Sequence, residues 1–338
     1  MQAWINQVWY GSSLWRWVLM PVSWLYAIVT AIRRQLYKSG FKKVTSLPVP
    51  VIIVGNITVG GSGKTPTVIY LIELLRQHGY KPGVISRGYG VTIEGVKSVY
   101  PGAKAMEVGD EPAMIVARTQ VPMVVGPNRI QAANQLLADF DVDIIISDDG
   151  LQHYAMARSI EMVVVDGHRR LGNGSLLPAG PLREGAWRLE QADFIIINGG
   201  EAKEGEFQMR LQAKPIQPLL TGSSHPFHRD EPIVAMAGIG DPQRFFNSLA
   251  QLGYQVHKTH GFDDHQAYYL STISDVAGNY PLVMTEKDAI KCMDFAKDNW
   301  GYLAVDASMS SGFEQALLIE ISAKMKALRS NILKQDRY

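Results

Sequence analysis

A glycine-rich loop between an apolar run and a helix-forming segment constrains this chain more than any other feature. The run PVPVIIVGNI, residues 48–57, is rich in β-branched residues and predicts a buried strand. The loop TVGGSGKT occupies residues 58–65, and the apolar spacing of residues 65–79 predicts a helix. A strand, a glycine loop and a helix in this order are typical of a phosphate-binding loop, whose backbone N–H groups hold an anion at the helix N-terminus.

The loop carries the side chains that a nucleotide requires. Its glycines let the backbone amides turn inward, Lys64 can reach the outer phosphates, and the hydroxyl of Thr65 can ligate Mg²⁺. The strict pattern G-x-x-x-x-G-K-[ST] has glycine where this chain has Thr58, so a merely flexible turn is the alternative. The predicted cradle consists of Thr58, Val59, Gly60, Gly61, Ser62, Gly63, Lys64 and Thr65.

A second motif, VDIIISDDGLQH, favours the nucleotide interpretation. An apolar strand that ends in a carboxylate is the usual second metal anchor of phosphate-loop enzymes. Asp148 and Asp149 stand at that end, where ligands of open α/β sheets bind. Asp-Asp-Gly can also be a solvated turn, but its combination with the loop predicts nucleotide binding.

Predicted strands and helices alternate along most of the chain. This pattern indicates a parallel sheet of the phosphate-loop NTPase type with helices on both faces. A mixed, proline-bearing stretch near residues 208–231 separates it from a second, smaller α/β alternation. We therefore expect an N-terminal helix at 1–36, a phosphate-loop core at 37–225 and a smaller domain at 226–338. In the smaller domain we expect a helix over 264–277 and a strand within GYLAVDAS, residues 301–308.

The segment WVLMPVSWLYAIVTAI, residues 17–32, carries no charge and is flanked by basic residues. It is shorter than the roughly 20 residues that a spanning helix needs, and it lacks an obvious signal-peptide cleavage site. Trp and Tyr favour the lipid–water interface, and neighbouring basic residues favour anionic lipid. We expect a helix that lies in or on the membrane at its cytoplasmic face; a buried core helix is the alternative.

Charge and cysteine content exclude several classes. The formal net charge is +1, which does not indicate general nucleic-acid binding. Cys292 is the only cysteine, so neither an intrachain disulfide nor a multi-cysteine zinc cluster can form, and an ordinary core or surface thiol is expected.

Seven motifs together resemble one family. In order they are GNITVGGSGKTP, SRGYG, GDEP, DDGLQH, PAGPLRE, FDDH and TEKD. The set resembles the tetraacyldisaccharide 4'-kinases, the lipid A kinases of Gram-negative bacteria, in which threonine also stands where this chain has Thr58. The resemblance implies transfer of the ATP γ-phosphate to the 4'-hydroxyl of a tetraacyldisaccharide 1-phosphate, giving lipid IVA. That acceptor is an anionic glycolipid of the inner membrane, which fits the apolar N-terminal segment.

The resemblance also implies roles for single residues. Asp149, Gln152 and Glu184 would join Thr65 around Mg²⁺, because hard cations prefer oxygen ligands. Asp110 of GDEP, assisted by His265 of FDDH, would accept the proton of the attacking hydroxyl, while Lys64 neutralises the phosphates. Helix capping is the alternative role for Asp110, and a capping or surface role is the alternative for His265. His153 is a second choice for the same site.

Further residues leave alternatives open. Arg87, Arg169, Arg170 and Arg183 could bind phosphate or could be solvated surface charges. TEKD, residues 285–288, could contact adenine or ribose, and its spacing fails the N-K-x-D pattern of guanine-specific GTPases, which favours ATP. The alternative functions are a switch-type GTPase or ATPase of the metal-chaperone or targeting class, and a non-catalytic membrane adaptor.

Overall fold

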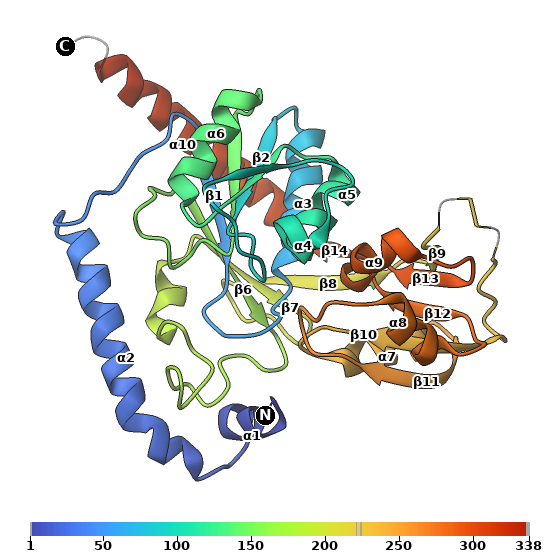
Figure 1. The fold of residues 1–338 in the computed structure, drawn as a ribbon. Coiled ribbons are helices and arrows are strands. Elements are labelled where there is room, and N and C mark those ends of the chain that lie inside the picture. Colours follow the sequence, from blue (N-terminus) through green and yellow to red (C-terminus); the bar gives the residue numbers. More distant parts are fainter. Residues whose placement is uncertain (1, 221, 224, 336–338) are drawn as a thin grey trace.

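The computed structural model describes residues 2–220, 222–223 and 225–335, and Figure 1 shows their arrangement around two sheets. The larger sheet has the strand order β14-β8-β7-β6-β1-β5-β2-β4-β3. Its inner strands are parallel, whereas β3 and β14 pair antiparallel at the two edges. Its strands are β1 (Val51–Gly55), β2 (Pro82–Ser86), β3 (Lys97–Val99), β4 (Met123–Val125), β5 (Ile144–Asp148), β6 (Ile160–Asp166), β7 (Phe194–Asn198), β8 (Phe207–Ala213) and β14 (Val305–Met309).

Helices cover both faces of the larger sheet, because its inner strands are apolar on both sides. One face packs against α3 (Lys64–Gln77), α4 (Ala105–Val108), α5 (Asp110–Thr119) and α10 (Phe313–Gln335). The opposite face packs against α6 (Arg129–Asp139) and the segments 151–156 and 171–192, the second of which contains the 3₁₀ helix η1 (Ala186–Gln191). The predicted parallel sheet with helices on both faces is confirmed.

The smaller sheet has the strand order β11-β10-β12-β13-β9 and is parallel except for β9. It consists of β9 (Gln217–Pro218), β10 (Pro232–Ala237), β11 (Gln255–Gly261), β12 (Leu282–Thr285) and β13 (Trp300–Leu303). One face packs on α7 (Pro242–Gln251), and the other packs on α8 (Leu270–Ala277) and α9 (Glu286–Cys292), which the 3₁₀ helix η2 (Met293–Phe295) follows. Cys292 is buried in this core, and burial raises the pKa of its thiol to about 12.

The chain returns to the larger sheet after the smaller one is complete. The run predicted as a single strand over 301–308 is divided: β13 ends at Leu303 in the smaller sheet, and β14 begins at Val305 in the larger. β14 pairs with β8, and α10 packs on the core beside it. Residues 305–335 therefore lie with the larger sheet, not with the smaller domain as the division at 226–338 had it. An apolar strand pattern does not specify which sheet the strand joins.

The N-terminal helices α1 (Gln2–Tyr10) and α2 (Trp15–Lys38) lie along one side of the molecule (Figure 1). In α2 the buried residue is a small polar one, Ser23, whose hydroxyl donates to Leu176 O at 2.9 Å. Exposed apolar side chains of α2 include Trp17, Val18, Trp24, Leu25 and Val29, each more than half exposed. Among the described residues, α2 is the one helix whose length and composition would allow it to cross a membrane.

Candidate functional site

The glycine loop lies between β1 and α3, as the sequence predicts. Gly60 and Gly63 have φ angles of 109° and 99°, in the region that favours glycine. A Cβ atom at Gly63 would lie 2.4 Å from Nδ2 of Asn198, an amide that donates to the backbone oxygen of Ser62 at 3.0 Å. Asn198 ends β7, two strands away from β1 in the sheet, and fixes the middle of the loop from there. No motif had marked it.

The segment PAGPLRE fixes the start of the loop. Val59 N donates to Pro181 O at 2.8 Å, and Arg183 N donates to Ile57 O at 2.7 Å. Thr58 forms an isolated bridge with Leu182. The position that departs from the generic loop is therefore paired as if in a short strand, which needs no glycine.

The carboxylate of Asp149 lies beside the lysine of the loop. Its Oδ1 is 3.7 Å from Lys64 Nζ, and Arg183 Nη1 donates to both of its oxygens at 3.2 and 3.0 Å. Burial raises the pKa of Asp149, but the charges of Lys64 and Arg183 outweigh it and hold the pKa below the usual value. The φ of 47° at Asp149 turns the chain at the end of β5.

Asp148, the last residue of β5, is fully buried. Ser86 donates to its Oδ2 at 3.2 Å, while its Oδ1 has no hydrogen-bond partner within the described residues. Burial, with the charges of Glu111 and Asp149, raises the pKa of Asp148. The buried Arg129 donates to the backbone oxygens of Asp148 and Asp149 at 3.3 and 2.7 Å, a contact that sequence reasoning missed.

Gln152 and Glu184 meet, as the resemblance implies. Gln152 Nε2 donates to Glu184 Oε2 at 3.0 Å, the hydroxyl of Tyr154 donates to Glu184 Oε1, and Arg188 Nε lies 3.7 Å from Glu184 Oε2. The neighbouring His153 is half-buried, and burial beside arginines lowers its pKa to about 4, so it is neutral at physiological pH. Neither Tyr154 nor Arg188 belongs to a motif that had singled it out as a functional residue.

The donor set fits a magnesium ion that is held together with phosphates. Within residues 2–220, 222–223 and 225–335, no group of three or more His, Cys, Asp or Glu side chains is arranged to hold a metal. Mg²⁺ typically takes one or two carboxylates, water and substrate phosphates, so such a cluster is not required. Among the residues that the structure describes, the buried oxygens Ser62 Oγ and Asp148 Oδ1 have no hydrogen-bond partner; the first belongs to the loop and the second to the end of β5.

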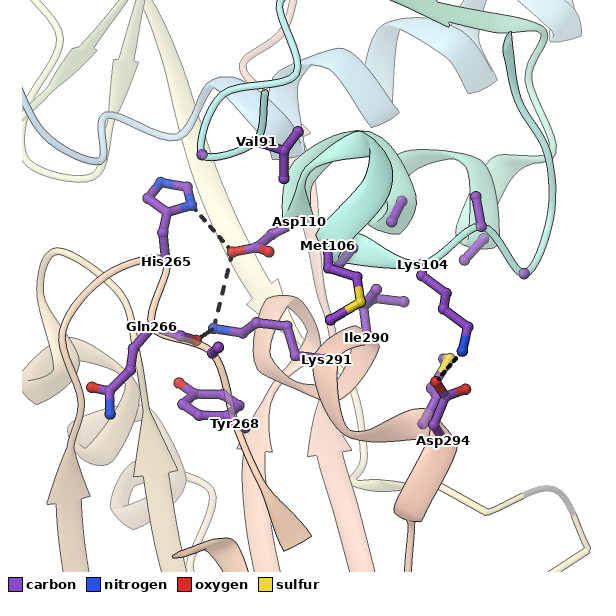
Figure 2. A pocket seen from close by; sticks show the side chains of 18 of the residues that line it. Val91, Lys104, Met106, Asp110, His265, Gln266, Tyr268, Ile290, Lys291 and Asp294 are labelled. Carbon is purple, nitrogen blue, oxygen red and sulfur yellow. Dashed lines mark hydrogen bonds and ion pairs between the residues drawn. The ribbon is translucent and has the colours of Figure 1, made fainter. Parts of the chain in front are cut away.

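Asp110 and His265 are brought together from the two sheets. Asp110 begins α5 on the larger sheet, His265 follows β11 of the smaller, and His265 Nδ1 lies 3.1 Å from Asp110 Oδ2 (Figure 2). Burial raises the pKa of Asp110. The hydrogen bond with His265 and the charges of Lys291 and Lys287 together lower it by more, so the pKa lies below its usual value. Neither residue caps a helix with its side chain at this position.

The expected helix over 264–277 begins later, at Leu270. The preceding residues form a loop in which His265 has a φ of 63°, a left-handed conformation that a helix does not contain. Asp263 N donates to Gln266 Oε1 at 3.3 Å and holds the bend. The loop places the imidazole against Asp110, and the ring of Tyr89 lies 5.0 Å from it.

TEKD makes contacts within the protein. The Thr285 side chain caps α9 by accepting a hydrogen bond from Asp288 N. Asp288 is fully buried, and its carboxylate accepts a hydrogen bond from the Thr285 hydroxyl. Lys287 binds Asp264 at 2.8 Å, and Glu286 binds Arg118 at 3.0 Å. The contact of TEKD with adenine or ribose stays a prediction.

The four arginines do not act alike. Arg170 is held by Glu206 through both carboxylate oxygens, at 3.0 Å, and so stabilises a turn. Arg169 reaches Asp241 of the smaller sheet at 3.3 Å and lies close to Gly60. Arg183 binds Asp149, while Arg87 is exposed.

Comparison with known proteins agrees with this geometry. The family of tetraacyldisaccharide-1-P 4'-kinases, LpxK, matches residues 15–322. The chain belongs to this family. It is 61% identical over 334 residues to the tetraacyldisaccharide 4'-kinase of Shewanella baltica strain OS155, and the match covers 98% of each chain. It is 64% identical over 323 residues to that of Shewanella halifaxensis, which covers 95% of this chain and 98% of the relative.

A solved structure of the same family shares the fold. The crystal structure of LpxK from Aquifex aeolicus in complex with ATP has a TM-score of 0.77 and 28% sequence identity, covering 91% of this chain and 100% of that chain. The sequence predictions of family, fold class and an ATP-dependent 4'-kinase of lipid A biosynthesis are confirmed. The switch-type NTPase and the non-catalytic adaptor are correspondingly disfavoured.

Proposed function

We propose that this chain transfers the γ-phosphate of ATP to the 4'-hydroxyl of a tetraacyldisaccharide 1-phosphate, and that Asp110 and His265 remove the hydroxyl proton. The observation that carries the proposal is the contact of Asp110 with His265 beside an intact phosphate-binding loop. The two parts are neighbours: α3, which begins at Lys64 of the loop, packs against α5, which begins at Asp110. A kinase needs both an anion cradle and a group that accepts the hydroxyl proton.

The loop residues 58–65 would bind the phosphates of ATP. Their backbone amides and Lys64 neutralise the charge that spreads over the transferring group. Lys64 is nearly buried beside Asp149, so its ammonium is held within the site instead of extending into solvent. The unpartnered hydroxyl of Ser62 and the hydroxyl of Thr65 complete the polar surface of the cradle.

Thr65, Asp149, Gln152 and Glu184 would hold Mg²⁺, directly or through water. Bound there, the ion neutralises phosphate charge and fixes the geometry of the outer phosphates. Tyr154 and Gln152 hold the two oxygens of Glu184 in place before any ligand binds. Arg183 holds Asp149 in the same way.

Transfer requires one proton and one phosphoryl movement. The 4'-oxygen attacks the γ-phosphorus, the bond to the β–γ bridging oxygen breaks, and its electron pair leaves with ADP. The proton of the hydroxyl passes to the carboxylate of Asp110. His265, at 3.1 Å, orients that carboxylate and shares the charge change.

The two sheets would form separate units that close on the nucleotide. We assign 39–213 and 305–335 to the kinase core, and 214–304, which include β9, to the smaller unit. Arg169 reaches Asp241 at 3.3 Å and Arg244 reaches Asp166 at 3.4 Å. A Cβ atom added at Gly240 would lie 3.7 Å from Gly61 N, so the backbone of the smaller unit comes close to the loop. These contacts lie beside the loop, so small rotations of one unit change the shape of the site.

α1 and α2, which lie within residues 2–38, would hold the enzyme on the cytoplasmic leaflet of the inner membrane, where its glycolipid acceptor lies. The exposed apolar face of α2 supports this assignment, since a core helix would bury that face. Arg16, Arg33 and Arg34 flank it and favour anionic lipid. Tyr26 donates to Arg183 O at 3.1 Å, which connects the helix to the segment that carries Glu184.

Transfer of labelled phosphate tests the proposal. The protein is incubated with γ-labelled ATP, Mg²⁺ and detergent-solubilised tetraacyldisaccharide 1-phosphate, and the product is mapped by NMR. We expect one new phosphate at the 4'-position. Steady ATP hydrolysis without labelled lipid would contradict the proposal.

A further inference from the structure

Lys291 lies between the two units, next to the Asp110–His265 pair. Its Nζ is 4.0 Å from Asp110 Oδ2, on the larger sheet, and its side chain is almost fully buried although it belongs to α9 of the smaller unit (Figure 2). It also lines a cavity of about 410 Å³ between the two units, together with Asp110 and His265. A buried lysine needs partners, and those of Lys291 identify what it does.

Three groups of the smaller unit hold the ammonium. Asp288 Oδ1 lies 3.1 Å away, one turn earlier on the same helix. Lys291 donates to the backbone oxygen of Gln266 at 3.2 Å, and its Nζ lies 4.0 Å from the centre of the Tyr268 ring. A long, flexible side chain is thus restricted to one position, with its charge directed at Asp110.

Asp288 is a fixed counter-ion. It is completely buried and accepts from Gly238 N at 2.9 Å, from the hydroxyl of Tyr268 at 2.7 Å and from the hydroxyl of Thr285 at 2.6 Å. A Cβ atom at Gly238 would lie 2.1 Å from the Tyr268 hydroxyl oxygen, so the arrangement requires glycine there. These three hydrogen bonds fix the position of the Asp288 carboxylate, so it remains beside Lys291.

The bond to Gln266 links Lys291 to the other member of the pair. Gln266 follows His265, whose φ of 63° is a conformation that persists only when surrounding contacts enforce it. Lys291 therefore contacts the loop that carries the imidazole and lies within ion-pair distance of the carboxylate. One side chain, that of Lys291, therefore helps to orient both members of the proton-accepting pair.

We propose that Lys291, anchored by Asp288, is a positioning residue for phosphoryl transfer. Its ammonium lies within ion-pair distance of Asp110 and also binds the loop that carries His265. The inference rests on the base role proposed above for Asp110. The charged and titratable groups around the pair are Lys291, Lys287 and Asp264 from the smaller unit and Glu111 from α5. Around Lys291 itself they are Asp110, Asp288, Tyr268 and Cys292.

The test uses two variants and one matched control in the full-length enzyme. Lys291→Met removes both the charge and the bond to Gln266. Lys291→Gln removes the charge but keeps an N–H donor. Lys104→Met is the control, since Lys104 lines the same cavity and binds the exposed Asp294 at 3.0 Å. For each protein, kcat, the KM for ATP, the pH profile of kcat and the melting temperature are measured with the lipid acceptor.

We expect Lys291→Met to lower kcat about tenfold to hundredfold, as a displaced reacting group does, with the KM for ATP changed by less than about threefold. Loss of a nearby cation raises the pKa of a carboxylate, so the acidic limb of kcat should move about one pH unit upward in both Lys291 variants. Lys291→Gln should retain more of kcat than Lys291→Met. Lys104→Met should behave like the wild type in every measurement.

An unmoved acidic limb in Lys291→Gln, or a loss of kcat that follows a lowered melting temperature and weaker ATP binding in both variants, would overturn the inference. If Lys291→Met does not fold, the acidic limb of Lys291→Gln decides alone. Asp110→Asn separates this inference from the proposed function. If Asp110→Asn retains turnover, the base role itself is lost. If Asp110→Asn is inactive while both Lys291 variants match the control, only the inference about Lys291 fails.

Discussion

His265 Nδ1 lies 3.1 Å from Asp110 Oδ2, although the two residues are 155 positions apart and belong to different sheets. The contact unites the N-terminus of α5 with a loop of the smaller unit. It therefore depends on how the two units are docked, whereas the phosphate-binding loop is formed within the larger sheet alone. Binding of the phosphates and removal of the proton should accordingly be separable by substitution.

His265→Ala should change the pH dependence of turnover. The hydrogen bond with His265 lowers the pKa of Asp110, and Asp110 can accept a proton only as the carboxylate. Removal of the imidazole raises the pKa of Asp110, because burial continues to disfavour the charged carboxylate. The acidic limb of the kcat profile should therefore move to higher pH, which a titration of turnover between about pH 3 and about pH 8 measures. An unchanged acidic limb with full activity would show that the contact does not act on Asp110.

Lys64→Ala should weaken ATP binding. A hydrogen bond to a charged group contributes about 1.5–3 kcal/mol, so the Kd for ATP should rise by about tenfold to hundredfold. Lys81→Ala is the control, because Lys81 is exposed and pairs with Asp141 on the surface. Calorimetric titration with ATP measures both. Equal affinities in the two variants would exclude Lys64 from the cradle.

Tyr154→Phe should weaken the response to magnesium. The Tyr154 hydroxyl donates to Glu184, and loss of a group that orients a metal ligand typically costs about tenfold to hundredfold in metal affinity or activity. Tyr37→Phe is the control, since its ring lies 6.1 Å from that of Tyr154. The Mg²⁺ concentration for half-maximal turnover measures the effect. A curve identical to the wild type would separate Glu184 from metal binding.

Leu25→Glu with Val29→Glu should detach the protein from vesicles that contain anionic lipid. Burying one such apolar side chain contributes about 1.5–3 kcal/mol, so two carboxylates should lower partitioning at least about tenfold. ATP affinity should remain, since α2 lies outside the loop. Ile319→Glu on α10 is the control, because Ile319 is also exposed and apolar. An equal loss of vesicle binding in the control would show that any added negative charge detaches the protein. No loss of vesicle binding in the α2 variant would exclude α2 from membrane binding.

The sequence predicts the parts of this site that short motifs define. Lys64 and Thr65 follow a strand and begin a helix, and Asp149 ends another strand, so local order places them. The roles of Asp110 and His265 were predicted only from the resemblance to a family, since neither spacing nor periodicity links GDEP to FDDH. Motifs did not identify Lys291, Asn198 or Tyr154, because these residues act through contacts between elements far apart in the chain.

The fold shows the same limit. Alternation of strands and helices predicts both sheets, but an apolar run does not state which sheet it joins. Ala304 separates β13 from β14, and the chain crosses between units there. The helix expected from residue 264 begins at Leu270, because the tertiary contact with Asp110 overrides local helix propensity around His265.

Single-turnover transfer by Asp110→Asn tests the central claim most directly. Enzyme in excess over γ-labelled ATP, with Mg²⁺ and the tetraacyldisaccharide acceptor, reports the transfer step apart from product release. The account predicts a rate lower by about 10²–10⁴-fold, the usual contribution of a general base, with ATP affinity close to that of the wild type. A transfer rate near that of the wild type, at the same ATP affinity, would contradict the assignment of Asp110 and His265 as the proton-accepting pair.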